Sequence, residues 1–515
     1  MSIPTVDPAQ SIPAFYSGRS IFITGATGFM GKVLIEKLLR SCPDIQEIFL
    51  LMRPKKGLSI DDRLRKLIAL PFFEKLRKER PNFIDKLIPV TGDVATEALG
   101  LPPLERKVIT ERVSIVFHVA ANVRFDDNLK HATFVNTRST RDICILAAQM
   151  KKLVALVHVS TAYSQADKPQ VEEKVYPFNV DWKKSIRIAE NVDNHLLRTL
   201  TPKYMDSFPN TYTFTKRLAE QVVHDYSGIL PAIIFRPSIV ISTIVEPVKG
   251  WIDNFNGPVG MLVGGGKGVL RVICLDPKIT SDYIPVDVAI KAMIIASWKR
   301  GLQTITRDPS IHVYNCCSGD IKSVSTREVI DTGIQITDEI PLGGILWFPG
   351  VTITTNKTIF FILMLFYHLI PAYLVDGILK LAGKKPMLVK LQRKVYTANS
   401  SLEYFLMNVW KFKNDNFLGL LTNLPPGDAE AFGYEYFSFD IREYFRWCIV
   451  GAKKYLLHES MDKLNEDKIQ YERMRWIDRI FKVWLAIGFS WLFVKMGLIA
   501  YLCRVLQEKF EIFNA

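Results

Sequence analysis

The sequence predicts an α/β fold: a doubly wound parallel sheet, followed by a mainly helical domain and a membrane-associated tail. Apolar runs alternate with amphipathic segments through the first half of the 515-residue chain, and a glycine-rich turn follows the first run. Such alternation is typical of parallel sheets that helices cover on both faces. Long apolar stretches then gather in the last third. With 48% hydrophobic and 11% aromatic residues, the chain can bury a large core, so disorder is excluded.

The glycine-rich turn is the most informative motif. It follows the predicted strand 20–23 and opens onto residues 33–40, whose apolar side chains recur at helical spacing. A strand that turns through glycines into a helix exposes backbone N–H groups at the positive end of the helix dipole, where a pyrophosphate can bind. This context favours a dinucleotide site over an ordinary glycine-containing loop. The candidate cofactor-binding residues in the turn are Gly25, Thr27, Gly28, Phe29, Met30 and Gly31.

The second predicted strand, 47–52, ends at Arg53. Enzymes that bind NAD usually carry an acidic residue here for the ribose 2′-hydroxyl, whereas an arginine suits the 2′-phosphate of NADP. Lys55 and Lys56 add positive charge nearby. A solvated basic strand end is the alternative, but the position favours NADPH as the cofactor.

Four more apolar runs predict further strands of the same sheet. Each run ends in small or polar residues, and in open α/β sheets ligands bind beyond the carboxyl ends of the strands. We therefore expect the residues that follow these runs to lie near the cofactor. The predicted strands are 86–90, 114–118, 153–159 and 232–236.

Tyr212 and Lys216 form the candidate catalytic pair. Of the 18 tyrosines, only Tyr212 has a lysine four residues later, which puts both side chains on one face of a helix predicted to begin at Thr211. A phenol with a reference pKa of about 10 is a poor acid or base at neutral pH, and a nearby ammonium should lower that pKa. A surface i, i+4 pair is the alternative. The glycine turn, together with Ser160 and Thr161 at the end of an intervening strand, makes the catalytic interpretation more specific.

The last third of the chain contains segments suited to a membrane. Residues 358–375 are almost wholly apolar and just long enough for a span, although a core or interfacial helix fits them equally. Residues 378–389 are short, basic and apolar, which suits lipid headgroups. Residues 483–494 and 496–503 are apolar on either side of Lys495, and they form either one span or two short helices in one leaflet. Both interpretations favour membrane attachment over a buried core helix.

Composition excludes several classes of protein. The formal net charge is +14, but acidic residues are interleaved with the basic ones and no run of five basic residues occurs, which argues against a nucleic-acid partner. The charge suits a membrane surface or the phosphates of coenzyme A. Seven irregularly spaced cysteines predict neither a disulfide framework nor a metal site. The first ten residues show no secretory signal.

Taken together, these motifs resemble those of the extended short-chain dehydrogenase/reductases, which have a Rossmann-type sheet. The glycines are spaced Gly-x-x-Gly-x-x-Gly, and three strand ends read His118-Val-Ala-Ala, Val159-Ser-Thr-Ala-Tyr and Arg236-Pro-Ser-Ile. Residues 251–258 and the aromatic, basic C-terminal third extend the resemblance, along nearly the whole chain, to the alcohol-forming fatty acyl-CoA reductases. The glycines and the candidate catalytic pair show no departure from that pattern.

The resemblance implies reduction of a long-chain fatty acyl-CoA by NADPH in two steps, through an aldehyde to a primary alcohol, with release of coenzyme A. It implies that Tyr212 donates a proton to the developing oxyanion, that Lys216 lowers the pKa of Tyr212 and binds the ribose, and that Thr161 hydrogen-bonds the same oxygen. Ser160 is the alternative donor. Cofactor contacts are implied for the adenine at Asp93 and Val94, for the central part at Ala120, and for the nicotinamide at Pro237, Ser238 and Ile239.

The expected organisation has three parts: a reductase domain at 1–346, a mainly helical domain at 347–465 and a membrane-attaching tail at 466–515. The resemblance implies an enzyme bound to the endoplasmic reticulum or the peroxisomal membrane, with its catalytic domain facing the cytosol and with membrane lipid and acyl-CoA as partners. Three alternatives stay open: another membrane-bound extended short-chain oxidoreductase that acts on a steroid or sugar nucleotide, an acyl-CoA reductase that releases the aldehyde, and a non-catalytic NADPH-binding membrane scaffold. No pattern in the sequence predicts an oligomeric state or an acyl chain length.

Overall fold

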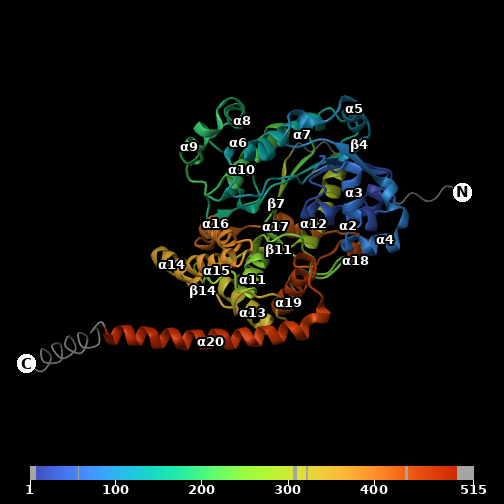
Figure 1. The fold of residues 1–515 in the computed structure, drawn as a ribbon. Coiled ribbons are helices and arrows are strands. Elements are labelled where there is room, and N and C mark those ends of the chain that lie inside the picture. The colour runs from blue at the N-terminus through green and yellow to red at the C-terminus, as the bar shows by residue number, and fades with distance from the viewer. Residues whose placement is uncertain (1–6, 56, 305–309, 320–322, 435–438, 496–515) are drawn as a thin grey trace, which may run out of the picture.

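A seven-stranded sheet forms the centre of the computed structural model, which describes residues 7–55, 57–304, 310–319, 323–434 and 439–495 (Figure 1). The strand order is β12-β7-β5-β4-β1-β2-β3, and every neighbouring pair is parallel. The order reverses between β1 and β4, as in doubly wound Rossmann sheets, so the predicted fold class is confirmed. The strands are β1 (Ser20–Thr24), β2 (Glu47–Met52), β3 (Leu87–Thr91), β4 (Val113–His118), β5 (Ala155–Val159), β7 (Ala232–Pro237) and β12 (His312–Cys316).

Helices cover both faces of this sheet. Ile21 belongs to the cluster formed with α2 and α12 on one face, and its neighbour Phe22 to the cluster formed with α7 and α10 on the other. Adjacent residues of a strand point to opposite faces, so a sheet covered on both sides needs continuously apolar strands. This is why the strands could be recognised as apolar runs. The four helices are α2 (Phe29–Ser41), α12 (Val286–Gln303), α7 (Ser139–Ala147) and α10 (Thr211–Tyr226).

A second core joins the C-terminal third to segments inserted in the reductase part. Leu262 of α11 (Gly257–Gly266) and Ile336 of α13 (Thr326–Glu339) share one apolar cluster with α19 (Ile441–Gly451). Two short parallel strand pairs also join segments that lie before residue 346 to segments that lie after it. The domain boundary expected at this residue stays a prediction. These pairs are β9 (Val272–Cys274) with β14 (Thr352–Thr354), and β6 (Gln170–Val171) with β15 (Lys411–Phe412).

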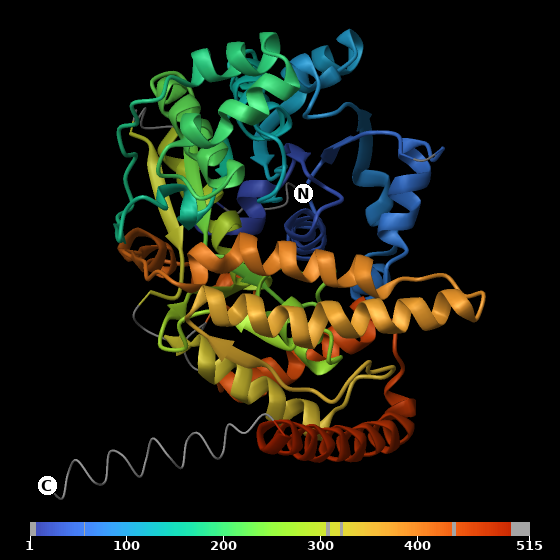
Figure 2. The ribbon, with the colours of Figure 1, turned by 60° about the vertical axis from the view of Figure 1, so that its left-hand side comes forward.

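The apolar segment predicted at 358–375 is part of one long helix. It comprises α14 (Lys357–Met364), a π-helical turn and α15 (Ile370–Leu381), and the chain returns along α16 (Leu388–Leu406) (Figure 2). Among the described residues, 357–381 is the one helix long and apolar enough to cross a membrane, with a mean hydropathy of 2.0. Its length and composition therefore agree with membrane association.

The tail begins with a 32-residue helix, α20 (Leu464–Lys495). The apolar segment 483–494 is the last part of this helix, whereas 496–503 and Lys56 lie outside the described residues. The remaining α-helices and strands are shorter. They are α1 (Ile12–Tyr16), α3 (Ile60–Ile68), α4 (Glu74–Glu79), α5 (Pro103–Arg112), α6 (Leu129–Ala132), α8 (Trp182–Asn191), α9 (Asn194–Met205), β8 (Ile239–Ile241), β10 (Thr280–Ser281), β11 (Tyr283–Pro285), β13 (Val324–Ser325), α17 (Asp415–Leu418) and α18 (Ala429–Phe432).

Candidate active site

The predicted site residues follow the carboxyl ends of neighbouring strands. Because all seven strands are parallel, these ends share one edge of the sheet, where ligands of open α/β sheets bind. The helix α10 brings Tyr212 and Lys216 to the same edge, because it packs beside β5 and β7. In chain order, the edge carries Gly25 after β1, Arg53 after β2, Asp93 and Val94 after β3, Ala120 after β4, Ser160 and Thr161 after β5, and Pro237, Ser238 and Ile239 at the end of β7.

The glycine turn leaves no room for side chains. Gly25 has a φ of +78°, and a Cβ on it would lie 2.7 Å from the backbone nitrogen of Ala120. A Cβ on Gly31 would lie 2.2 Å from the carbonyl oxygen of Gly25, so the first turn of α2 packs directly on the end of β1. Gly28 caps α2 without a side-chain hydrogen bond, which leaves the first N–H groups of the helix to a ligand. This cradle fits the pyrophosphate of a dinucleotide.

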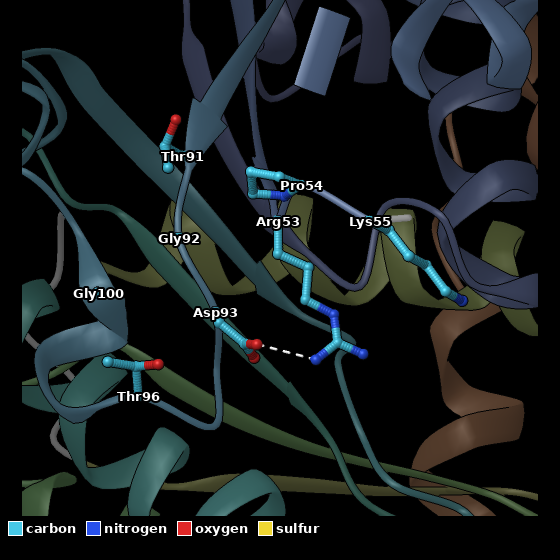
Figure 3. A pocket seen from close by; sticks show the side chains of 8 residues that line it. All are labelled: Arg53, Pro54, Lys55, Thr91, Gly92, Asp93, Thr96 and Gly100. Atoms are coloured by element: carbon cyan, nitrogen blue, oxygen red, sulfur yellow. Dashed lines mark hydrogen bonds and ion pairs between the residues drawn. The ribbon is translucent and has the colours of Figure 1, made fainter. Parts of the chain in front are cut away.

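The end of the site beyond β2 and β3 is basic and open. Arg53 Nη1 lies 2.8 Å from Asp93 Oδ2, so two residues predicted to bind separate parts of the cofactor form an ion pair with each other (Figure 3). The Arg53 side chain is 56% exposed, and water therefore screens this pair. Together with Lys55, the two residues line a cavity of about 570 Å³. Its volume and charge suit a phosphorylated adenosine.

Arg63 belongs to this basic end and was not predicted. It lies on α3, where its Nη2 donates a 3.3 Å hydrogen bond to the Thr27 hydroxyl and its Nη1 donates to the carbonyl oxygen of Arg53. The helix begins in a capping box between Ser59 and Asp62, which is readable from the sequence. That signal places a helix after Arg53, but it does not reveal that Arg63 turns back to the glycine turn.

Tyr212 and Lys216 lie on the first two turns of α10, as their spacing predicted. Asn210 caps this helix through its side chain. Lys216 Nζ donates a 2.7 Å hydrogen bond to the carbonyl oxygen of Val159, at the end of β5. The hydroxyl of Thr161 hydrogen-bonds the Tyr212 side chain. The phenol, the ammonium and this hydroxyl therefore meet at the end of one strand.

Burial controls the protonation of this pair. It raises the pKa of the Tyr212 phenol to about 12, and the hydrogen bond with Thr161 opposes this shift only in part. Burial also lowers the pKa of the Lys216 ammonium to about 8, against the effect of the Glu220 carboxylate. The lowering of the Tyr212 pKa that the Tyr–Lys spacing predicts is not what this geometry produces. The phenol stays protonated at neutral pH and can act as a proton donor.

Ser160 is engaged elsewhere, in a buried network that sequence reasoning missed. Its hydroxyl donates a 2.6 Å hydrogen bond to Glu220 Oε1, and Glu220 forms a 2.7 Å ion pair with Arg236 in which both side chains are 0% exposed. Ser164 donates to the same carboxylate. Glu220 follows Lys216 by four residues, and this spacing could have predicted from the sequence that both side chains lie on one face of α10. The network thus engages the Ser160 hydroxyl, whereas the partner of Tyr212 is Thr161.

His118 and His158 are packed residues in the core of the sheet. They lie side by side on β4 and β5, with ring centroids 5.4 Å apart. The Nδ1 of His118 lies 2.7 Å from the hydroxyl of Thr24. Burial lowers the pKa of His118 to about 3 and that of His158 far below its usual range. Both rings are therefore neutral and do not act as general bases.

The segment 251–258 lies against α2, the helix that follows the glycine turn. The ring of Trp251 stacks on Phe29 of α2 at 5.3 Å and packs on Phe72 at 4.0 Å. Lys32, one turn further along α2, forms a 2.6 Å ion pair with Asp253. This segment thus packs on the start of α2.

These features define a class of protein. A glycine cradle at the start of α2, a Tyr–Lys pair beside a strand-end threonine and a basic pocket after β2 are arranged along one sheet edge. This is the arrangement of a nicotinamide-dependent reductase of the extended short-chain type.

Sequence comparisons identify the family. A family model described as male sterility protein matches residues 23–293, and a second with the same description matches 367–459. Fatty acyl-CoA reductase 1 of Pongo abelii is 38% identical over 465 residues, which cover 90% of each chain. The enzyme of the same name from Homo sapiens is 37% identical over 465 residues, and fatty acyl-CoA reductase wat of Drosophila melanogaster is 36% identical over 473. They cover 90% and 92% of this chain, and 90% and 91% of their own lengths. The chain belongs to the fatty acyl-CoA reductase family.

Solved structures share the fold. The terminal R domain from the myxalamid PKS-NRPS biosynthetic pathway aligns with a TM-score of 0.55 at 19% identity, covering 86% of this chain and 93% of that one. The reductase domain of a non-ribosomal peptide synthetase from Mycobacterium tuberculosis aligns with a TM-score of 0.52 at 17% identity, covering 88% and 97%. At these identities the likeness concerns the fold alone.

Proposed function

We propose that this protein reduces long-chain fatty acyl-CoA to the primary alcohol with two molecules of NADPH, through a bound aldehyde and with release of coenzyme A. Membership of the fatty acyl-CoA reductase family supports the substrate. The observation that carries the chemistry is the meeting of Tyr212, Thr161 and Lys216 at the end of β5. This cluster lies at the sheet edge that also carries the glycine cradle.

The chain's own residues supply a proton and a polarising environment. In the first step hydride adds to the thioester carbon, Tyr212 gives its proton to the developing oxyanion, and the thiohemiacetal then expels the thiol of coenzyme A to leave an aldehyde. The phenolate of Tyr212 then takes up a proton from solvent. In the second step hydride adds to the aldehyde, and Tyr212 again protonates the oxygen. NADPH, when bound, supplies one hydride to each step. The Thr161 hydroxyl stabilises the same oxygen, and Lys216, held by the Val159 carbonyl, binds the ribose of the cofactor.

The raised pKa of Tyr212 fits a reductase. A phenol with a pKa of about 12 is fully protonated when the carbonyl arrives, and it gives up the proton only as negative charge develops on the neighbouring oxygen. Thr161 rather than Ser160 is proposed as the second donor, because the Ser160 hydroxyl already donates to Glu220.

NADPH is proposed as the cofactor because of the basic end of the site. Arg53 and Lys55 line the pocket beyond β2. Arg63 donates to the carbonyl oxygen of Arg53 and to the Thr27 hydroxyl, and so joins this end to the glycine turn. A 2′-phosphate there would compete with Asp93 for the guanidinium of Arg53. The proposed cofactor contacts are those of the glycine turn (Gly25, Thr27, Gly28, Phe29, Met30, Gly31), the strand ends (Arg53, Asp93, Val94, Ala120, Pro237, Ser238, Ile239) and Lys216.

The tail is proposed to attach the enzyme to the endoplasmic reticulum or the peroxisomal membrane, with the catalytic part facing the cytosol. The last part of α20 supports this, because Trp484, Trp491 and Val494 are 59–66% exposed on a helix that leaves the body of the protein (Figure 1). Aromatic residues of this kind are typical of membrane interfaces.

The test is the identity of the product. Membranes from cells that express the protein are incubated with NADPH and labelled acyl-CoAs of varied chain length, and the lipids are identified. Fatty alcohol with two NADPH consumed per acyl-CoA is the expected result. Accumulation of aldehyde with one NADPH consumed would instead identify an aldehyde-releasing reductase. NADPH binding without turnover would favour a scaffold, and turnover only with a steroid or sugar nucleotide would assign the protein to another reaction.

A further inference from the structure

The helix 357–381 presents a wholly apolar ridge to the outside. Positions four residues apart lie on one side of an α-helix, and positions two apart lie roughly 200° around it. Two such series, offset by two residues, run along this helix. One of them is buried in the protein, and the other is exposed. The outward ridge consists of Ile362, Phe366, Ile370, Leu374 and Ile378, whose side chains are 39–64% exposed.

The opposite ridge is fixed to the protein along its whole length. Its members are Phe360, Met364, His368, Ala372 and Asp376, and all are at most 8% exposed. Phe360 and Met364 pack on β9 in an apolar cluster. His368 Nε2 accepts a 3.2 Å hydrogen bond from a backbone N–H of the chain entering β9, and its Nδ1 lies 2.6 Å from a glutamine of α16. Asp376 accepts three backbone hydrogen bonds at the start of α16.

This attachment argues against a span. A helix that crossed the bilayer would carry β9 and α16 into the hydrocarbon with it, and α16 alone contains Lys390, Arg393, Lys394 and Glu403. Each buried charge costs roughly 2.5–3.5 kcal/mol on insertion scales. A helix that lies in the membrane surface can keep its protein contacts on one side and lipid on the other.

Positive charge surrounds the ridge at the turn into α16. Between residues 377 and 402 the chain contains no acidic residue. Lysines and an arginine extend from this turn into α16 at exposed positions, and such clusters attract anionic lipid headgroups. They are Lys380, Lys384, Lys385, Lys390, Arg393 and Lys394.

The direction of α20 is consistent with the same membrane plane. In Figure 1 this helix runs across the view and passes beyond α14 and α15, whereas in Figure 2 it is strongly foreshortened while α14–α15 lies lengthwise. The two helices therefore run in clearly different directions. Two such directions are parallel to one common plane, so a membrane that lies along α14–α15 can also lie along α20.

We propose that the helix 357–381 lies flat in the surface of a lipid bilayer, as a second attachment beside the tail. Its apolar ridge enters the boundary between headgroups and acyl chains, and the cations at its end contact anionic headgroups. A second copy of the chain fits this face less well, because it would add positive charge to positive charge. The contact extends the membrane attachment proposed above and does not depend on the reaction.

The experiment measures the membrane depth of labels on the full chain. Single cysteines replace Ile362, Ile370 or Ile378, at the two ends and the middle of the ridge, in a Cys503→Ser background. The six other cysteines are buried in the structure. Each variant carries a fluorophore and is reconstituted into phosphatidylcholine–phosphatidylserine vesicles that contain a nitroxide lipid quencher, placed either near the headgroup or near the chain end. Leu196→Cys on α9 and Val494→Cys on α20 are the controls, with side chains 53% and 63% exposed in wild type.

The expected result is quenching of all three ridge labels at one shallow depth. The label at 196 should escape the quenchers, and the label at 494 reports whether the tail has inserted. Reversing both Lys384 and Lys385 to glutamate should reduce quenching along the ridge.

A middle label deeper than the two end labels would show a span and overturn the proposal. If the label at 494 is quenched but the ridge labels are no more quenched than the label at 196, the proposal is overturned. The attachment of the tail to the membrane would then still hold. Excimers between pyrene-labelled ridges without vesicles would assign the face to a second copy.

Discussion

The two ends of the candidate active site hold their charges in opposite ways. At the catalytic end, Glu220 and Arg236 are 2.7 Å apart and both 0% exposed, whereas at the basic end Arg53 and Asp93 are 2.8 Å apart and 56% and 28% exposed. Nearly equal distances therefore describe very different interactions. A buried pair leaves a charge unpaired in a dry environment when one partner is removed, while water screens the exposed pair. We infer that the buried end fixes the chemistry and the exposed end rearranges around the cofactor.

The largest effect is expected at the reacting group. Tyr212→Phe should lower kcat for acyl-CoA reduction by about 10²–10⁴-fold, because a positioned general acid contributes that much. Stopped-flow or steady-state NADPH oxidation measures it. Tyr226→Phe, at the far end of the same helix, is the matched control and should keep the wild-type rate. A Tyr212→Phe protein that turns over within a factor of two of wild type would remove this residue from the mechanism.

The second largest effect is expected on stability, when the buried ion pair between Glu220 and Arg236 is broken. Glu220→Gln is expected to lower the free energy of unfolding by about 3–5 kcal/mol, because Arg236 keeps its charge without its partner. Urea unfolding followed by tryptophan fluorescence measures the loss. Glu74→Gln breaks an exposed 2.7 Å pair with Lys78 and should cost less than about 0.5 kcal/mol. Replacing Glu220 and Arg236 together by apolar residues should recover most of the loss, and equal costs for the two single variants would contradict the comparison.

The pH dependence probes the buried end without breaking it. Lys216 loses its proton as the pH rises through about 8, because burial lowers its pKa, while the phenol of Tyr212 stays protonated to about 12. We therefore expect kcat/KM to fall above about pH 8, with a limiting slope of tenfold per pH unit. Lys216→Arg keeps a charge at every pH and should flatten this fall while lowering the maximum rate. An unchanged profile in Lys216→Arg would show that another group titrates.

Much of the site follows from local patterns. Gly25 and Arg53 are marked by their place after predicted strands, and Tyr212 with Lys216 by helical spacing, so the sequence alone located them. The partners of these residues depend on packing between distant segments. Glu220 and Arg236 are 16 residues apart on different elements, and the raised pKa of Tyr212 comes from burial, which no local pattern records.

The C-terminal third shows the same distinction. Its apolar content is visible in the sequence, but a surface helix and a span have the same composition at 358–375. The difference lies in which ridge is covered, and His368 or Asp376 reveal this only through their contacts with other elements. The position where α20 begins is likewise fixed by a contact between distant segments, because Lys453 binds Asp467 in its first turn.

At the exposed end the expected effect is on cofactor choice. Arg53→Ala should raise KM for NADPH by about 10–100-fold and change KM for NADH little, since the guanidinium acts on the 2′-phosphate alone. Initial rates with each cofactor measure the ratio. Arg63→Ala should produce a smaller shift in the same direction, because Arg63 also holds the glycine turn through Thr27. Arg65, exposed on the same helix, provides the control, and an equal loss with both cofactors in Arg53→Ala would reject NADPH selection by this residue.

The smallest effect is expected from the exposed pair itself. Asp93→Asn removes the carboxylate that faces Arg53 but leaves a side chain of the same size, and water already screens the interaction. The free energy of unfolding should fall by less than about 1 kcal/mol, and the difference from wild type should shrink further in high salt. Urea unfolding at two ionic strengths measures both. If Asp93→Asn instead cost as much as Glu220→Gln, exposure would not be what separates the two ends of the site, and the basic end would be as rigid as the catalytic one.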